Sequence, residues 1–79
     1  MAMTDKEWSA MVWHATKDAN VLMAHLKANP GDLDKVRSQA ARLADEDRKS
    51  GGYVFKRCYI SKKTHEVLTN ALRQAQAHE

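Results

Sequence analysis

Residues 4–28 read TDKEWSAMVWHATKDANVLMAHLKA, and this stretch decides the fold. Thr4 and Glu7 have the spacing of a capping box, in which each side chain accepts a hydrogen bond from a backbone amide at a helix start. The apolar residues that follow recur at steps of three and four, which places them on one stripe of a helix: Trp8, Met11, Val12, Ala15, Ala19, Leu22, Met23 and Leu26. The stretch therefore predicts one long amphipathic helix over residues 5–28.

A second helix is expected over residues 30–49. Pro30 suits the first helical position, and Asp32 places a negative charge near the positive helix start. Its apolar stripe is thinner and rich in alanine: Leu33, Val36, Ala40, Leu43 and Ala44. Gly51 ends it, because glycine readily takes the left-handed cap conformation. The short connection predicts an antiparallel hairpin of residues 5–28 and 30–49.

Residues 53–60 are rich in β-branched and aromatic side chains and follow two glycines, which predicts a short extended segment. A lone strand must pair with a copy of itself or with a partner, or lie irregularly on the helices. Ser61 then caps a C-terminal helix over residues 62–77, with an apolar side of Val67, Leu68, Ala71, Leu72 and Ala75. We therefore expect a mainly α fold in a single domain over residues 1–79.

The composition restricts the class of protein. The chain has 79 residues, of which 43% are hydrophobic and 29% charged, so it is neither collagen-like nor wholly disordered. Its single cysteine, Cys58, excludes a disulfide-stapled scaffold, and we expect it to be a buried small hydrophobe. Charges interrupt the first 27 residues, and no stretch approaches the roughly 20 apolar residues of a membrane span. We expect a cytoplasmic protein with no membrane association.

The net charge of +3 is unevenly divided along the chain. Up to Asp47 there are six bases against eight acids, whereas from Arg48 onward there are seven bases against two acids. Residues 48–63 hold six bases and no acid, interleaved with aromatic residues. Cations neutralise phosphates and aromatic rings stack on unpaired bases, so this segment is a candidate nucleic-acid site. Its residues are Arg48, Lys49, Lys56, Arg57, Lys62, Lys63, Tyr53, Phe55 and Tyr59. An acidic protein partner and simple solvation are the alternatives.

The stretch from Arg57 to Leu68, RCYISKKTHEVL, resembles the strand-to-first-helix junction of ribbon-helix-helix repressors. In that family, strands from two chains pair into a ribbon that enters the DNA major groove. The resemblance implies that Tyr53, Phe55, Arg57 and Tyr59 share one ribbon face, with Val54, Lys56, Cys58 and Ile60 on the other. It covers less than a quarter of the chain, and we do not assign the family on it.

Metal and catalytic sites are not expected. His14 and His25 lie eleven residues apart, about 16 Å along a helix, which is too far to share one ion. Cys58 and His65 have no further ligand at suitable spacing, and no Gly-rich phosphate loop or nucleophile motif is present. We expect neither a cofactor nor an enzymatic activity. For Asp47 we expect a salt bridge to Arg57 or Lys56 across the Gly51-Gly52 turn.

Trp13 lies far from the apolar stripe of the first helix, on a side shared with Lys17 and Val21. Tryptophan is enriched at protein interfaces, so these three residues are a candidate protein-binding surface. The sequence thus supports a small non-catalytic regulatory protein that binds nucleic acid through residues 48–63. The alternative is a mobile-element type of adaptor or inhibitor that contacts a host protein through the Trp13 side of the first helix and the basic segment. The long helix, the lone strand and the second apolar side favour a homodimer.

Overall fold

The computed structural model describes residues 3–77, and helices make up most of this range. In chain order these elements are α1 (Asp5–Ala15), α2 (Ala19–Ala28), the 3-10 turn η1 (Pro30–Asp32), α3 (Leu33–Lys49), α4 (Tyr53–Arg57) and α5 (Tyr59–Ala77). No strand occurs within residues 3–77. The prediction of a mainly α fold is therefore confirmed.

The N-terminal helix begins as expected but is broken in the middle. Thr4 Oγ1 accepts a hydrogen bond from the Glu7 amide at 3.2 Å, which is the half of the expected capping box that the Thr4 side chain supplies. The prediction of one helix over residues 5–28 is wrong, because Asp18 starts a new one. Its side chain accepts a hydrogen bond from the Asn20 amide at 3.0 Å, and the Thr16 hydroxyl donates to the Trp13 carbonyl at 2.6 Å. These polar side chains bond the backbone groups that the break frees.

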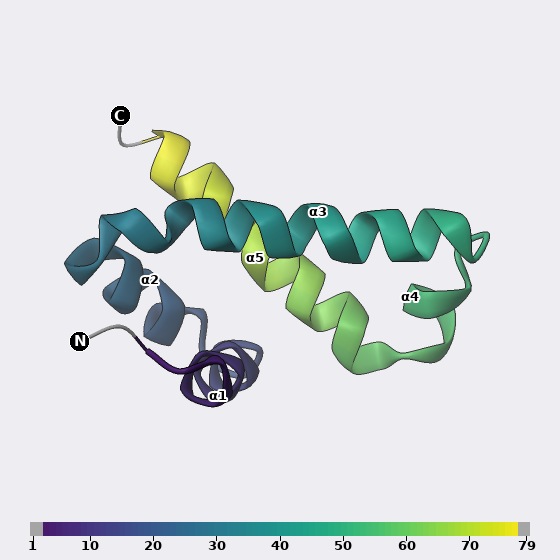
Figure 1. Cartoon of the computed structure of the whole chain (residues 1–79), viewed down its shortest axis with the longest axis horizontal. Coiled ribbons are helices and arrows are strands. Elements are labelled where there is room, and N and C mark those ends of the chain that lie inside the picture. Colours follow the sequence, from purple (N-terminus) through teal and green to yellow (C-terminus); the bar gives the residue numbers. More distant parts are fainter. Residues whose placement is uncertain (1–2, 78–79) are drawn as a thin grey trace.

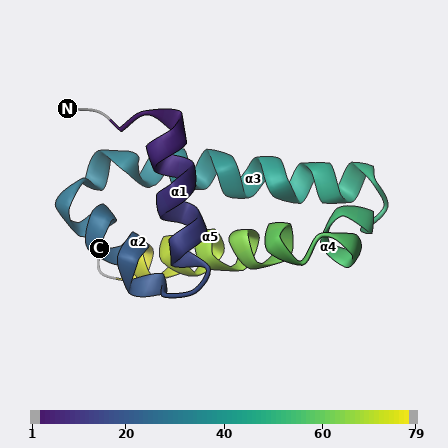
Figure 2. The same ribbon diagram turned by 90° about the horizontal axis from the view of Figure 1, so that it is seen from below.

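The antiparallel hairpin is formed by α3 and α5, rather than by residues 5–28 and 30–49. These two helices run in opposite directions and pack most extensively on each other, with α4 at the turn between them (Figures 1 and 2). α1 runs across this hairpin, and α2 leads through η1 into the start of α3 (Figure 2). The break after α1 allows this arrangement, since a straight helix of about 35 Å would carry residues 19–28 away from the hairpin.

The expected extended segment over residues 53–60 is also wrong, because all of it except Cys58 is helical. Gly51 and Gly52 turn the chain with φ angles of 72° and 86°, which favour glycine. The amides of Tyr53 and Val54 donate to Ser50 Oγ at 3.1 and 3.2 Å. Since side chains of this chain satisfy the amides, the segment needs no partner strand. The ribbon implied by the repressor resemblance is therefore absent from residues 3–77.

α5 begins at Tyr59, so Ser61 lies in its first turn instead of capping it. This start adds Tyr59, Ile60 and Ser61 to the helix expected over residues 62–77. The side chains of Tyr59 and Ile60 consequently follow the helical register of α5. That register places both at a hollow that Trp13 of α1 also lines.

One apolar core joins α1, α2, α3 and α5. Its largest fully buried side chains are Trp8, Leu22, Leu68 and Val36, and the remaining buried members are Met11, Val12, Ala15, Leu26, Ala40 and Ala71. All ten belong to the stripes predicted from the sequence. Ala19 and Ala44 were predicted to belong to the same stripes, but both are exposed. The periodicity therefore identified the core although it did not identify the break.

A polar contact closes the corner between α2 and α3. His25 Nε2 lies 2.6 Å from Asp32 Oδ2, and the His25 ring meets the edge of Trp8 at a centroid distance of 5.8 Å. Lys35 Nζ lies 4.9 Å from the centre of the Trp8 ring. The buried Trp8 ring of α1 thus contacts α2 through His25 and α3 through Lys35, which ties the N-terminal half to the hairpin.

Candidate protein-binding face

Three of the exposed large hydrophobic side chains gather on one side of the molecule. Trp13 is 41% exposed, Ile60 48% and Tyr59 69%. Trp13 comes from α1, whereas Tyr59 and Ile60 come from the first turn of α5. They line two adjoining hollows that share Trp13 and Ile60. The tertiary fold therefore joins two segments that the sequence analysis treated as separate sites.

The first hollow, of about 240 Å³, lies between α1, α3 and α5. Its apolar lining includes Val12 of α1, Leu43 of α3 and Leu68 of α5, and Arg42 lies at the same hollow. Leu68 is fully buried, so this hollow lies directly over the core.

The second hollow, of about 360 Å³, lies between the end of α1 and the start of α5. Thr16 and Lys17 line it from one side, and Tyr59, Ile60 and Lys63 from the other. We refer to Trp13, Lys17, Tyr59, Ile60 and Lys63 as the Trp13 face. It combines an apolar centre with basic side chains at its edge.

Both lysines of the Trp13 face lie against aromatic rings. Lys17 Nζ is 5.4 Å from the centre of the Trp13 ring, and Lys63 Nζ is 5.7 Å from that of Tyr59. Cation–π attraction of this kind is worth about 0.5–1 kcal/mol at exposed sites. Among the described residues that line the two hollows, none is acidic. The face therefore presents positive charge around exposed apolar surface.

The candidate nucleic-acid residues are distributed over α3, α4 and the start of α5. Arg48 and Lys49 both pair with Asp45 inside α3, the lysine at 3.0 Å. Phe55 is half-buried and packs on His65 at a centroid distance of 5.0 Å, so its ring is not free to stack on a base. Tyr59 and Lys63 also belong to the Trp13 face.

The rest of the basic segment lies on α4 and the first turn of α5. Arg57 donates to the Tyr53 hydroxyl at 2.6 Å, and its guanidinium carbon lies 4.4 Å from the centre of that ring. Lys56, Arg57 and Lys62 are exposed and make no ion pair with the described residues. α4 lies at the end of the α3–α5 hairpin that is remote from α1 (Figures 1 and 2).

The predicted protein-interface set is only partly brought together. Trp13 and Lys17 lie on the Trp13 face, but Val21 belongs to α2, beyond the break, and lines neither hollow. Ile60 and Arg42 are the residues that sequence reasoning missed. Ile60 was assigned to an extended segment, and nothing in its local sequence indicates that it lies opposite Trp13.

Two expectations about single residues are wrong. Asp47 makes no salt bridge to Lys56 or Arg57; its Oδ1 accepts the Phe55 amide at 2.8 Å. An amide at the start of α4 has no helical partner, so the carboxylate satisfies it. Cys58 is exposed rather than buried, because it lies in the bend between α4 and α5. The hydroxyl of Ser61 donates to its sulfur at 3.1 Å, which lowers the pKa of the Cys58 thiol.

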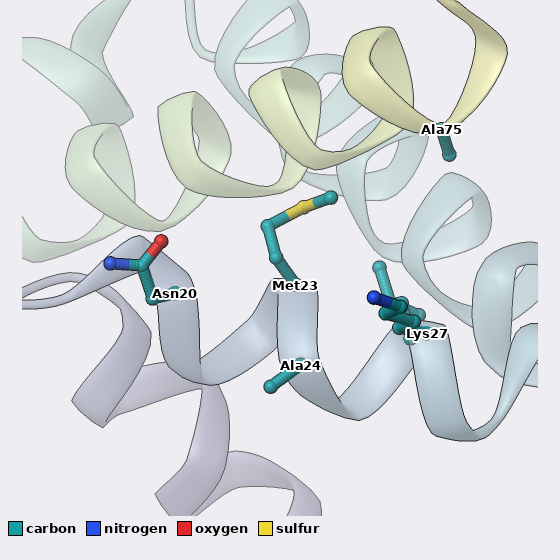
Figure 3. Close-up of a pocket in the computed structure, with 6 residues that line it drawn as sticks. Asn20, Met23, Ala24, Lys27 and Ala75 are labelled. Atoms are coloured by element: carbon teal, nitrogen blue, oxygen red, sulfur yellow. The ribbon is translucent and has the colours of Figure 1, made fainter. Parts of the chain in front are cut away.

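A further hollow of about 610 Å³ lies between α2 and the end of α5 (Figure 3). Met23 points from α2 toward α5, and Asn20 and Lys27 lie along the same helix (Figure 3). Ala75 contributes from the other side. This hollow contains none of the residues predicted to bind a partner.

Residues 3–77 contain no group of three or more His, Cys, Asp or Glu side chains placed to hold a metal ion. Within the same range, no helix has both the length and the apolar character needed to cross a membrane. A comparison of the chain with protein-family models, curated proteins and solved structures finds no match. The functional argument therefore depends on the geometry of the chain itself.

Proposed function

We propose that this chain is a non-catalytic protein-binding module that contacts its partner through the Trp13 face. The supporting observation is the convergence of Trp13, Tyr59 and Ile60, all exposed, around shared hollows. Tryptophan, tyrosine and arginine dominate the energetics of protein interfaces, and the strongest contacts lie in pockets from which water is excluded. Clustered apolar side chains that remain exposed mark such surfaces more often than scattered ones do.

The partner in this proposal is a different protein rather than a second copy of the chain. Two of the three observations that favoured a homodimer, the long helix and the lone strand, do not hold for residues 3–77. The third, the second apolar side, is the Trp13 face. A two-fold dimer through this face would bring Lys17 and Lys63 of both copies into one interface whose hollows have no acidic lining among the described residues, which like-charge repulsion opposes.

The test is the affinity of the purified partner, isolated by affinity capture from the cells that produce this chain. We expect Ile60→Asp and Trp13→Ala to weaken binding by roughly 30-fold or more, as removal of an interface anchor does. Val21→Asp is the matched control. Val21 is also a β-branched residue in the first turn of a helix and is 38% exposed, but it lies outside the face. Equal losses for Ile60→Asp and Val21→Asp would contradict the proposal.

A second candidate function, nucleic-acid binding, draws support from the charges of α4 and the adjoining turn of α5. Lys56, Arg57 and Lys62 make no ion pair with the described residues, and Tyr53 beside them is 49% exposed. Binding of this kind weakens with salt, with a log–log slope of about −0.9 per phosphate neutralised in duplex DNA. A gel-shift experiment with random duplex DNA and RNA at low salt tests it. The triple variant Lys56→Gln, Arg57→Gln, Lys62→Gln should abolish the shift, and the absence of any wild-type shift would end this candidate.

A further inference from the structure

We infer that the partner presents an acidic amphipathic helix, whose apolar side chain enters the hollow beside Trp13 and Ile60 and whose carboxylates pair with Lys17 and Lys63. This inference deepens the proposed function and rests on it. It names the chemistry of the bound segment, which the position of the face alone does not. Three features of the Trp13 face support it: its charge, its apolar lining and its backbone.

The charge of the face selects an acidic segment. Lys17, Lys63 and Arg42 are the charged residues that line the two hollows, and no acidic side chain within residues 3–77 lines either of them. Each lysine is held near a ring, so its ammonium group lies at the edge of the apolar surface. Glu66, which lines neither hollow, lies 4.0 Å from the Lys63 ammonium, and the Lys63 side chain remains 42% exposed. Complementary charge on a partner raises the association rate and fixes its register.

The apolar lining of the face favours an apolar anchor. The hollow beside Trp13 and Ile60 is also lined by Val12, Leu43 and Leu68, and it lies over the core. Filling it removes apolar surface of both molecules from water. A nucleic acid offers phosphates to the lysines but no side chain that can enter this hollow, whereas a bulky aliphatic or aromatic residue can.

The backbone of the face favours a helical segment. The face is built from α1 and α5, and no strand edge exists within residues 3–77 to which an extended peptide could add. A helix satisfies its own backbone groups and needs only side-chain contacts. It can also place an apolar stripe and flanking carboxylates side by side.

The experiment uses a synthetic helical peptide as the probe, with leucines at helical spacing and glutamates on both sides of the leucine stripe. A second peptide has the same pattern with Gln in place of Glu. Binding is measured from the fluorescence of Trp13, because Trp8 is only 1% exposed and Trp13→Phe identifies its contribution. We expect the acidic peptide to bind roughly tenfold more tightly than its Gln counterpart. The difference should disappear in the double variant Lys17→Gln, Lys63→Gln.

Three results would overturn the inference. They are equal binding of the two peptides, displacement of the acidic peptide by a random single-stranded oligonucleotide at equal concentration, and burial of Trp13 through self-association. Binding of the natural partner distinguishes failure of this inference from failure of the proposed function. If that binding requires Ile60 but is unchanged by Lys17→Gln and Lys63→Gln, only the prediction of an acidic helix is wrong. If it does not require Ile60, the prediction that the Trp13 face binds the partner is wrong.

Discussion

Trp13 of α1 and Ile60 of α5 line the same two hollows, although they are far apart in the sequence. Two local features create this pairing. The break at residues 16–18 ends α1 close to Trp13, and the helical start of α5 at Tyr59 fixes the direction of Ile60. Both were absent from the sequence-based expectation. The candidate face is thus a product of tertiary structure.

Residues of the Trp13 face should contribute little to folding, in contrast to the core residue beneath them. Leu68→Ala should lower the free energy of unfolding by about 2–5 kcal/mol, since Leu68 is fully buried. Ile60→Ala, at a half-exposed position, should change it by less than about 1 kcal/mol. Urea denaturation measures both values. A similar loss for the two variants would show that Ile60 is needed for stability rather than for binding.

Asp47 should stabilise α4 through its hydrogen bond to the Phe55 amide. Asp47→Ala removes the acceptor and should lower the free energy of unfolding by about 1 kcal/mol, as loss of a cap does. Asp47→Asn keeps an oxygen acceptor and should cost less. Hydrogen exchange at the Phe55 amide provides a local measurement, and it should accelerate in the alanine variant. Unchanged exchange there would mean that Asp47 does not hold this turn.

Gly52 should tolerate no side chain without a backbone penalty. Its φ of 86° lies in the left-handed region, and the space around its Cα is open, so the cost of Gly52→Ala is conformational. We expect a loss of about 1 kcal/mol in thermal or urea unfolding. Gly31→Ala is the control, because Gly31 has similarly open surroundings without a positive φ. If the two variants lose equal stability, the left-handed turn is not the reason.

Cys58 should react with iodoacetamide at lower pH than an ordinary cysteine does. The Ser61 hydroxyl lowers the pKa of its thiol by donating to the sulfur, so the thiolate becomes populated earlier as the pH rises. The alkylation rate plotted against pH should therefore have a depressed midpoint. Ser61→Ala should move that midpoint upward. Identical midpoints for wild type and variant would remove Ser61 as the cause.

The sequence was sufficient to predict the core and much of α3. Every buried apolar side chain falls on a predicted stripe, because helical periodicity is a local property that burial preserves. The Thr4 cap and the glycine turn after α3 were also predicted correctly, since each depends on residues a few positions apart. These features needed no knowledge of the tertiary contacts.

The break after α1 and the helical character of residues 53–57 could not be predicted in the same way. The apolar stripe continues through Thr16 and Asp18, so periodicity gives no sign that Asp18 caps a new helix. β-branched and aromatic side chains favoured a strand over residues 53–60, but side chains of the preceding helix and turn, Asp47 and Ser50, satisfy the amides of a helix there. The break after α1 separates Val21 from the candidate face, and the helical start of α5 places Ile60 on it.

The central claim is that the Trp13 face binds a protein partner, and acrylamide quenching of Trp13 fluorescence in the purified complex tests it most directly. Trp13 is exposed and Trp8 is buried in the free chain, so acrylamide should quench Trp13 far more readily than Trp8. We predict that partner binding protects Trp13 from acrylamide and shifts its emission to shorter wavelength. A complex that forms while Trp13 remains as readily quenched as in the free chain would contradict the account.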